Sequence, residues 1–180
     1  MLEKILEHNK KFVEDRKAKG EDKPASSHAR KEVMVFTCMD TRLVDLLEKA
    51  MGFGRGDIKI LKNAGNIIRE GCDDVIRCIS IGTTLMGIKE VYIVGHKDCG
   101  MRKQTPESVR NKMIEKGISQ ETLNSVDIEK WAGLIKDEKE NVLNGIKMIK
   151  SSPFIPKDVK IYGLLMDPNS GEIEVIFKED

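Results

Sequence analysis

The fold is decided by two stretches of similar design, Glu32-Val-Met-Val-Phe-Thr-Cys-Met-Asp-Thr-Arg42 and Glu90-Val-Tyr-Ile-Val-Gly-His-Lys-Asp-Cys-Gly100. Each begins with a short run of β-branched and aromatic residues, at 32–37 and 90–94, which is typical of a buried strand of a parallel sheet. Each then passes into cysteine, histidine and charged side chains. Because ligands bind at the carboxyl ends of strands in open α/β sheets, the two stretches predict a functional site where they end.

The rest of the chain alternates strands of this kind with amphipathic helices. Further strands are expected at 57–61, 159–165 and 172–177, and helical segments at 43–51, 72–87, 106–116 and 127–150. This alternation predicts an α/β fold with a central, mostly parallel sheet of about five strands flanked by helices. The sequence Asp-Pro-Asn-Ser-Gly at 167–171 is a tight turn, so the last strand should be an antiparallel edge strand beside four parallel ones.

The length of 180 residues suits a single domain, 1–180. Its first part, 2–17, places Leu2, Ile5, Leu6, Phe12 and Val13 at helical spacing, and a polar loop at 19–24 follows. Two interpretations remain open for this helix. It either packs on its own domain, or residues 1–24 form an arm that lies across a partner subunit.

The composition excludes several classes of partner. The chain has 31 basic and 30 acidic residues and a net charge of +1, so neither nucleic acid nor an anionic membrane is an expected partner. No apolar run approaches the ~20 residues of a membrane-spanning helix. Charges interrupt the apolar positions of the N-terminal segment, which a signal peptide does not tolerate, and we therefore expect a cytoplasmic location.

Three residues at the two strand ends form a candidate metal site. Cys38 stands at the end of the strand at 32–37, and His96 and Cys99 follow the strand at 90–94 in a His-x-x-Cys pattern. Taken alone, Cys38 could be a buried apolar residue, and His-x-x-Cys is a weak motif. Together they offer two thiolates and one imidazole, a set that suits Zn²⁺ and leaves one tetrahedral position open for catalysis. Cys72 and Cys78 have no such neighbours and are interpreted as packing residues on the helix at 72–87.

Asp40 and Arg42 lie directly after the first candidate ligand. A carboxylate at this position can accept a hydrogen bond from zinc-bound hydroxide, or it can bind the metal as a fourth ligand in a closed state. A bidentate contact from Arg42 would hold the carboxylate away from the metal. The alternative is a surface ion pair of little consequence. Cys38 and Arg42 are too close together for the phosphate-binding loop of a Cys-dependent phosphatase.

The sequence Cys38-Met-Asp-Thr-Arg, paired with Gly95-His-Lys-Asp-Cys-Gly100, resembles the signature of β-class carbonic anhydrases. The segment Lys62-Asn-Ala-Gly65 and the order of elements are also similar to that family, over roughly residues 30–180. The short chain looks like the compact branch found in archaea and bacteria. The resemblance implies reversible hydration of CO2 to bicarbonate and a proton by zinc-bound hydroxide, in a homodimer or higher assembly.

Carried over by motif, the resemblance implies that Cys38, His96 and Cys99 bind one Zn²⁺ per chain and that Asp40 and Arg42 form a catalytic dyad. Three other hypotheses stay open. The same zinc site could hydrolyse CS2 or COS. Zinc could be a structural clip with Asp40 as its fourth ligand. Cys38 and Cys99 could also form a thiol redox pair, although the Cys-x-x-Cys motif of such proteins is missing.

Overall fold

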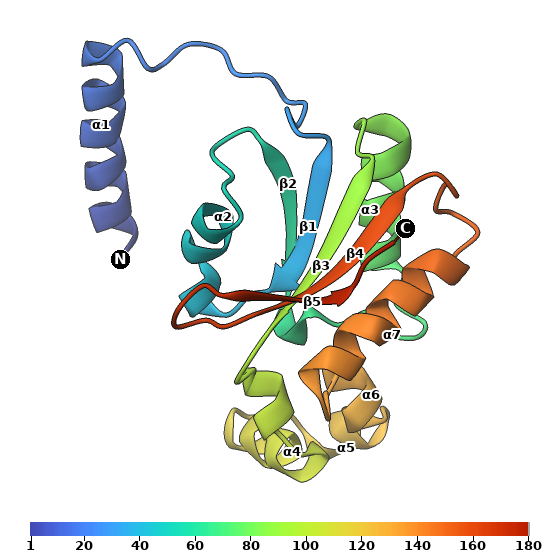
Figure 1. Cartoon of the computed structure of the whole chain (residues 1–180). Coiled ribbons are helices and arrows are strands. Elements are labelled where there is room, and N and C mark those ends of the chain that lie inside the picture. Colours follow the sequence, from blue (N-terminus) through green and yellow to red (C-terminus); the bar gives the residue numbers. More distant parts are fainter. Residues whose placement is uncertain (180) are drawn as a thin grey trace.

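Five strands form one sheet in the order β2-β1-β3-β4-β5 in the computed structural model, which describes residues 1–179 (Figure 1). The first four strands are parallel, and only the last pair is antiparallel. The strands are β1 (Val33–Cys38), β2 (Ile58–Asn63), β3 (Glu90–His96), β4 (Lys160–Met166) and β5 (Ile173–Phe177). The predicted α/β fold class, with four parallel strands and an antiparallel edge strand, is therefore confirmed.

Apart from the first helix, the helices either flank this sheet or cluster beyond its carboxyl edge (Figure 1). They are α1 (Leu2–Ala18), α2 (Leu46–Ala50), α3 (Asp74–Leu85), α4 (Pro106–Glu115), α5 (Gln120–Asn124), α6 (Ile128–Ala132) and α7 (Glu138–Ser151). Three short 3₁₀ turns, η1 (Thr41–Leu43), η2 (Ala64–Asn66) and η3 (Gly100–Lys103), follow β1, β2 and β3. No helix among residues 1–179 is both long and apolar enough to span a membrane.

The core has two layers, one on each face of the sheet, because successive strand residues point to opposite faces. In β1, Met34 and Phe36 join the cluster packed under α3 and α7, whereas Val33 and Val35 join the cluster that includes Leu47 of α2. All six residues of β1 are buried. Burial on both faces explains the unbroken apolar run that identified this strand. It also fixes the position of Cys38, the last residue of the strand.

Two of the predicted helices are interrupted in the structure. The helix expected at 43–51 is split, because Val44 is extended and Asp45 has a positive φ of 68°. The segment expected at 127–150 contains two helices: Gly133, in the left-handed conformation, ends α6, and Asp137 caps the start of α7. Glycine is favoured at such a helix end because it has no Cβ. α5 was not predicted.

The boundaries of two further elements differ from the prediction in ways that matter for the site. β3 continues two residues beyond 94, so that His96 is its last residue and pairs with Met166 of β4. α3 begins at Asp74, so Cys72 precedes the helix, and only Cys78 of the two lies on it. Because His96 belongs to the sheet itself, its backbone is fixed by strand pairing and not by a loop.

The N-terminal helix α1 stands apart from the sheet at the end of an extended segment (Figure 1). None of its residues is buried, and the apolar side chains predicted to form its packing face are 39–68% exposed from Leu2 to Val13. The helix predicted at 2–17 is therefore confirmed, but within residues 1–179 it does not pack on its own domain.

Candidate metal centre

Cys38, His96 and Cys99 converge at the carboxyl edge of the sheet. Cys38 is the last residue of β1, His96 is the last residue of β3, and Cys99 directly precedes η3. Their ligand atoms all lie within 4.8 Å of one another, and all three residues are buried. β1 and β3 are neighbours in the sheet, so the parallel pairing itself brings the first ligand beside the other two.

The His96 ring is oriented as a metal ligand would be. Its Nδ1 lies 2.9 Å from the carbonyl oxygen of Lys97 and donates a hydrogen bond to it. This bond fixes the tautomer in which Nε2 carries the free lone pair. Nε2 is buried and has no hydrogen-bond partner. A buried polar atom without a partner costs about 1–3 kcal/mol, and a metal ion bound at this atom would remove that cost.

The two thiols of the cluster shift each other's pKa in opposite directions. The hydrogen bond from Cys99 lowers the pKa of Cys38 to about 4, against the opposing effect of burial, and His96 and backbone groups of Asp40 and Gly65 add to the lowering. The same contact with Cys38, together with burial, raises the pKa of Cys99. Two adjacent thiolates repel each other unless a cation lies between them. A divalent ion would supply that charge, so the donor set fits a metal such as zinc.

Hydrogen bonds between neighbouring strands, and between α7 and the turn after β2, hold the backbone around the cluster. The Thr37 hydroxyl, one residue before Cys38, donates to the carbonyl oxygen of Val94 at 2.7 Å. Behind the cluster, the amide of Asn141 on α7 donates to the carbonyl oxygens of Gly65 and Asn66 at 3.1 and 3.0 Å. Gly65 has a positive φ of 77°, which glycine adopts without strain. The turn after β2 is thereby held against Cys38.

Asp40 and Arg42 form a bidentate ion pair beside the cluster. Nε and Nη2 of Arg42 donate to the two carboxylate oxygens of Asp40 at 3.0 and 2.8 Å, and the Arg42 backbone N–H adds a bond of 2.9 Å. Hydrogen bonds from Arg42 lower the pKa of Asp40 to about 2. Oδ2 of Asp40 lies 3.9 Å from the free Nε2 of His96. The carboxylate is thus next to the candidate ligands, while the arginine holds it.

Asp98, to which the sequence patterns assigned no role, is a second partner of Arg42. Nη1 of Arg42 donates to Oδ2 of Asp98, and Nη2 donates to its carbonyl oxygen, both at 3.0 Å. Asp98 has a positive φ of 59°, and its carboxylate also pairs with Lys103 at 2.5 Å. Lys103 and Arg42 together hold the pKa of Asp98 below its usual range. Arg42 therefore joins the loop after β1 to the loop after β3.

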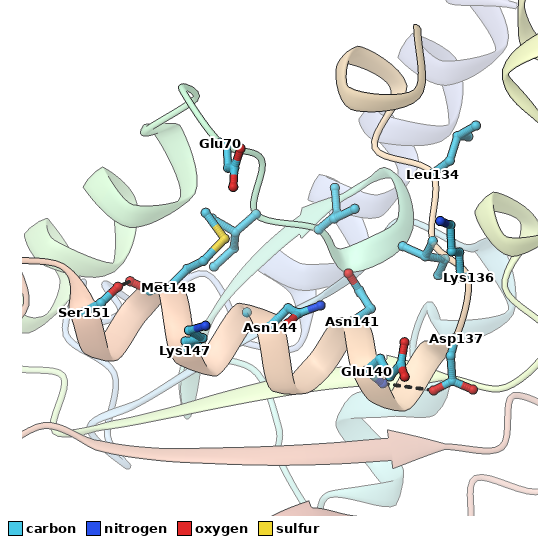
Figure 2. A pocket seen from close by; sticks show the side chains of 14 residues that line it. Glu70, Leu134, Lys136, Asp137, Glu140, Asn141, Asn144, Lys147, Met148 and Ser151 are labelled. Carbon is cyan, nitrogen blue, oxygen red and sulfur yellow. Dashed lines mark hydrogen bonds between the residues drawn. The ribbon is translucent and has the colours of Figure 1, made fainter. Parts of the chain in front are cut away.

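The other residues considered from the sequence lie outside this cluster. Cys72 and Cys78 are partly buried, and an Nη of Arg69 lies 3.2 Å from Sγ of Cys72. A hollow of about 500 Å³ runs along α7, but its wall contains none of the three candidate ligands. Figure 2 shows this hollow with Asp137 and Glu140 at the start of the helix. The candidate metal ligands therefore lie at the strand ends and not in this hollow.

The chain is similar to known proteins over most of its length. A family model described as carbonic anhydrase matches residues 33–173. YvdA of Bacillus subtilis (strain 168), which bears the provisional name of a carbonic anhydrase, is 37% identical over 180 residues, covering 97% of this chain and 90% of the relative. The crystal structure of a β-carbonic anhydrase from Trichomonas vaginalis matches with a TM-score of 0.91 and 32% identity, over 99% of this chain and 98% of that one.

A relative with a different name is also similar. A carbon disulfide hydrolase of Acidianus sp. (strain A1-3) is 31% identical over 170 residues, covering 83% of this chain and 81% of the relative. The family match and the B. subtilis relative each span well over half of the chain, and the shared fold extends to nearly all of it. On these grounds the chain belongs to the β-carbonic anhydrase family of lyases.

Proposed function

We propose that this protein catalyses the reversible hydration of CO2 to bicarbonate and a proton, with one Zn²⁺ per chain held by Cys38, His96 and Cys99. The observation that carries the proposal is the convergence of three buried residues whose metal-binding atoms lie within 4.8 Å of one another. When bound, zinc would lower the pKa of a water ligand towards 7, from about 15.7 in bulk water, and so make it nucleophilic.

Asp40 would orient the attacking water. Hydrogen bonds from Arg42 lower its pKa to about 2, so the carboxylate is ionised at neutral pH and can accept a hydrogen bond. Arg42 holds both carboxylate oxygens, which prevents Asp40 from turning onto the metal. If Arg42 released it, Asp40 would be close enough to become a fourth ligand and give a closed, inactive state.

The experiment that tests this function is stopped-flow CO2 hydration at about pH 8.5, above the near-neutral pKa of zinc-activated water. The protein is first assayed for zinc content. We expect one zinc per chain and fast hydration. One zinc per chain with no hydration at any alkaline pH would contradict the proposal and support zinc as a structural clip.

Hydrolysis of CS2 on the same site is the second candidate, because a relative with 31% identity is named carbon disulfide hydrolase. A crystal structure of the apo form of a carbon disulfide hydrolase has a TM-score of 0.70 to this chain, against 0.91 for the T. vaginalis β-carbonic anhydrase. The closer overall shape favours CO2. Measuring the release of hydrogen sulfide from CS2 on the same zinc-loaded sample separates the two functions.

We also propose that residues 1–24 form an arm that packs on a partner subunit of a homodimer. All the apolar side chains of α1 are exposed, and an amphipathic helix is rarely stable in water without a surface to cover. The face of the sheet that carries the Leu47 cluster offers such a surface. Val175 of β5 is 62% exposed, and Tyr92 and Tyr162, stacked at 4.7 Å between ring centroids, are only partly buried.

Deletion of residues 1–24 should convert the dimer to monomer, because it removes the apolar surface that joins the subunits. Sedimentation velocity of the full-length and truncated proteins at equal concentrations measures this change. A matched variant, Leu6→Ala with Phe12→Ala, should weaken the dimer while it keeps the arm. An unchanged sedimentation coefficient after the deletion would show that the arm has no part in assembly.

A further inference from the structure

Glu138 is a buried carboxylate that no step of the proposed function uses. It is the first residue of α7 and is only 8% exposed. Burial of a charge is costly unless the charge is paired and hydrogen-bonded. Its partners lie in the loop that carries Cys99. The Cys99 backbone N–H donates to Oε1 at 3.4 Å, and Oε2 lies 3.3 Å from Nη1 of Arg102 in η3.

The position of Glu138 is fixed by the start of its helix. The Asp137 carboxylate caps α7 by accepting hydrogen bonds from the N–H groups of Lys139 and Glu140, both at 2.9 Å. Figure 2 shows the bond to Glu140. Capping of this kind sets the direction of the first turn. The helix N-terminus also favours a negative charge, which offsets part of the burial cost of Glu138.

The same turn packs directly against the strand that bears His96. A Cβ added to Gly95 would lie 2.8 Å from Cγ2 of Val142 and 3.6 Å from the carbonyl oxygen of Glu138. Glycine at this position therefore lets the start of α7 approach β3 closely. Glu138 packs against β3, which bears His96, and its side chain contacts the loop that carries Cys99. It therefore links the backbone at Cys99 to the strand at His96.

We propose that Glu138 is a positioning residue for the metal centre, which holds Cys99 at the distance from Cys38 and His96 that a metal ion requires. The inference rests on the proposed zinc site and adds a residue from outside the ligand motifs. Arg102 completes the connection, because its Nε also donates to the carbonyl oxygen of Lys136 at 3.3 Å. The loop after β3 is thus joined at two residues to the segment around the start of α7.

The test is the zinc affinity of the full-length protein, measured by competition with a chromophoric chelator. Glu138→Ala should bind zinc about 10–100-fold more weakly, the usual effect of removing an outer-shell partner of a ligand. Glu138→Gln, which keeps an acceptor for the Cys99 N–H, should lie closer to wild type. Glu140→Ala is the matched control, because Glu140 is an exposed acidic residue of the same helical turn and should leave the affinity unchanged.

Two further measurements separate positioning from a general loss of stability. The metal-free proteins are unfolded thermally, and the Co²⁺-loaded proteins are compared by their thiolate charge-transfer absorption. A positioning role predicts weaker affinity and an altered band in Glu138→Ala. A lower unfolding temperature with unchanged affinity and band would overturn it. If Glu138→Ala does not fold, Arg102→Ala takes its place, with weaker zinc binding expected; unchanged affinity there would likewise overturn the proposal.

The outcome for wild type distinguishes this inference from the proposed function. If the wild-type chain binds no zinc, the metal centre itself is wrong. If it binds zinc only as tightly as Glu138→Ala does, the metal centre stands and the role of Glu138 is wrong.

Discussion

Replacement of Cys38 by serine is expected to abolish zinc binding and reduce CO2 hydration to the uncatalysed rate. Cys38 supplies a thiolate, because contacts with Cys99 and His96 lower its pKa, whereas a serine hydroxyl stays protonated and binds zinc poorly. Two ligands would then remain from the set of three. The loss in affinity should exceed the 10–100-fold cost typical of outer-shell substitutions. Metal analysis after dialysis and stopped-flow hydration measure both effects.

The control for this prediction is Cys78→Ser. Cys78 is a partly buried thiol on α3 and is not part of the cluster, so its replacement should leave zinc content and hydration unchanged. Retention of one zinc per chain and of the wild-type rate in Cys38→Ser would contradict the proposed ligand set. Loss of zinc in both variants would instead point to a general disturbance of the fold.

The fold and the candidate ligands could be predicted because they depend on local patterns. Apolar runs identified the strands, and the parallel order followed from the alternation of strands with helices. Cys38 and His96 each end a strand, so the common edge of a parallel sheet was enough to place them together. The interruptions of the helices also had local signals that the prediction did not use, namely Gly133 as a helix end and Asp137 as a cap.

The supporting residues could not be predicted, because their partners are distant in the sequence. Asp98 meets Arg42 from 56 positions away, and Glu138 meets Cys99 from 39. Neither contact follows from hydrophobic periodicity or from the spacing of a motif. Both depend on how loops leave the sheet: a positive φ directs Asp98 towards Arg42, and Gly95 admits the start of α7.

Replacement of Arg42 by alanine is expected to lower CO2 hydration about a hundredfold or more, the lower range for loss of a positioned catalytic group. Without the bidentate contact, the Asp40 carboxylate is free to turn towards the metal. Arg42→Lys keeps the charge but not the two parallel hydrogen bonds, so its rate should lie between those of wild type and Arg42→Ala. Arg77→Ala, which removes an exposed arginine from α3, is the control and should keep the wild-type rate.

Arg42→Ala should also change the stability of the protein in acid. Unfolding of the metal-free proteins, followed by circular dichroism at a series of pH values, measures this effect. Arg42 depresses the pKa of Asp40 to about 2, below the ordinary value near 3.9. The unfolded chain therefore binds more protons between these values, so this contribution to stability is complete above about pH 4 and is lost as the pH falls through about 2. In Arg42→Ala the pKa of Asp40 rises towards its ordinary value, and the stability should depend less steeply on pH in this range.

An acid profile and a hydration rate both equal to wild type would show that Arg42 does not hold Asp40 in solution. A changed acid profile with an unchanged rate would show that the pair forms but does not serve catalysis.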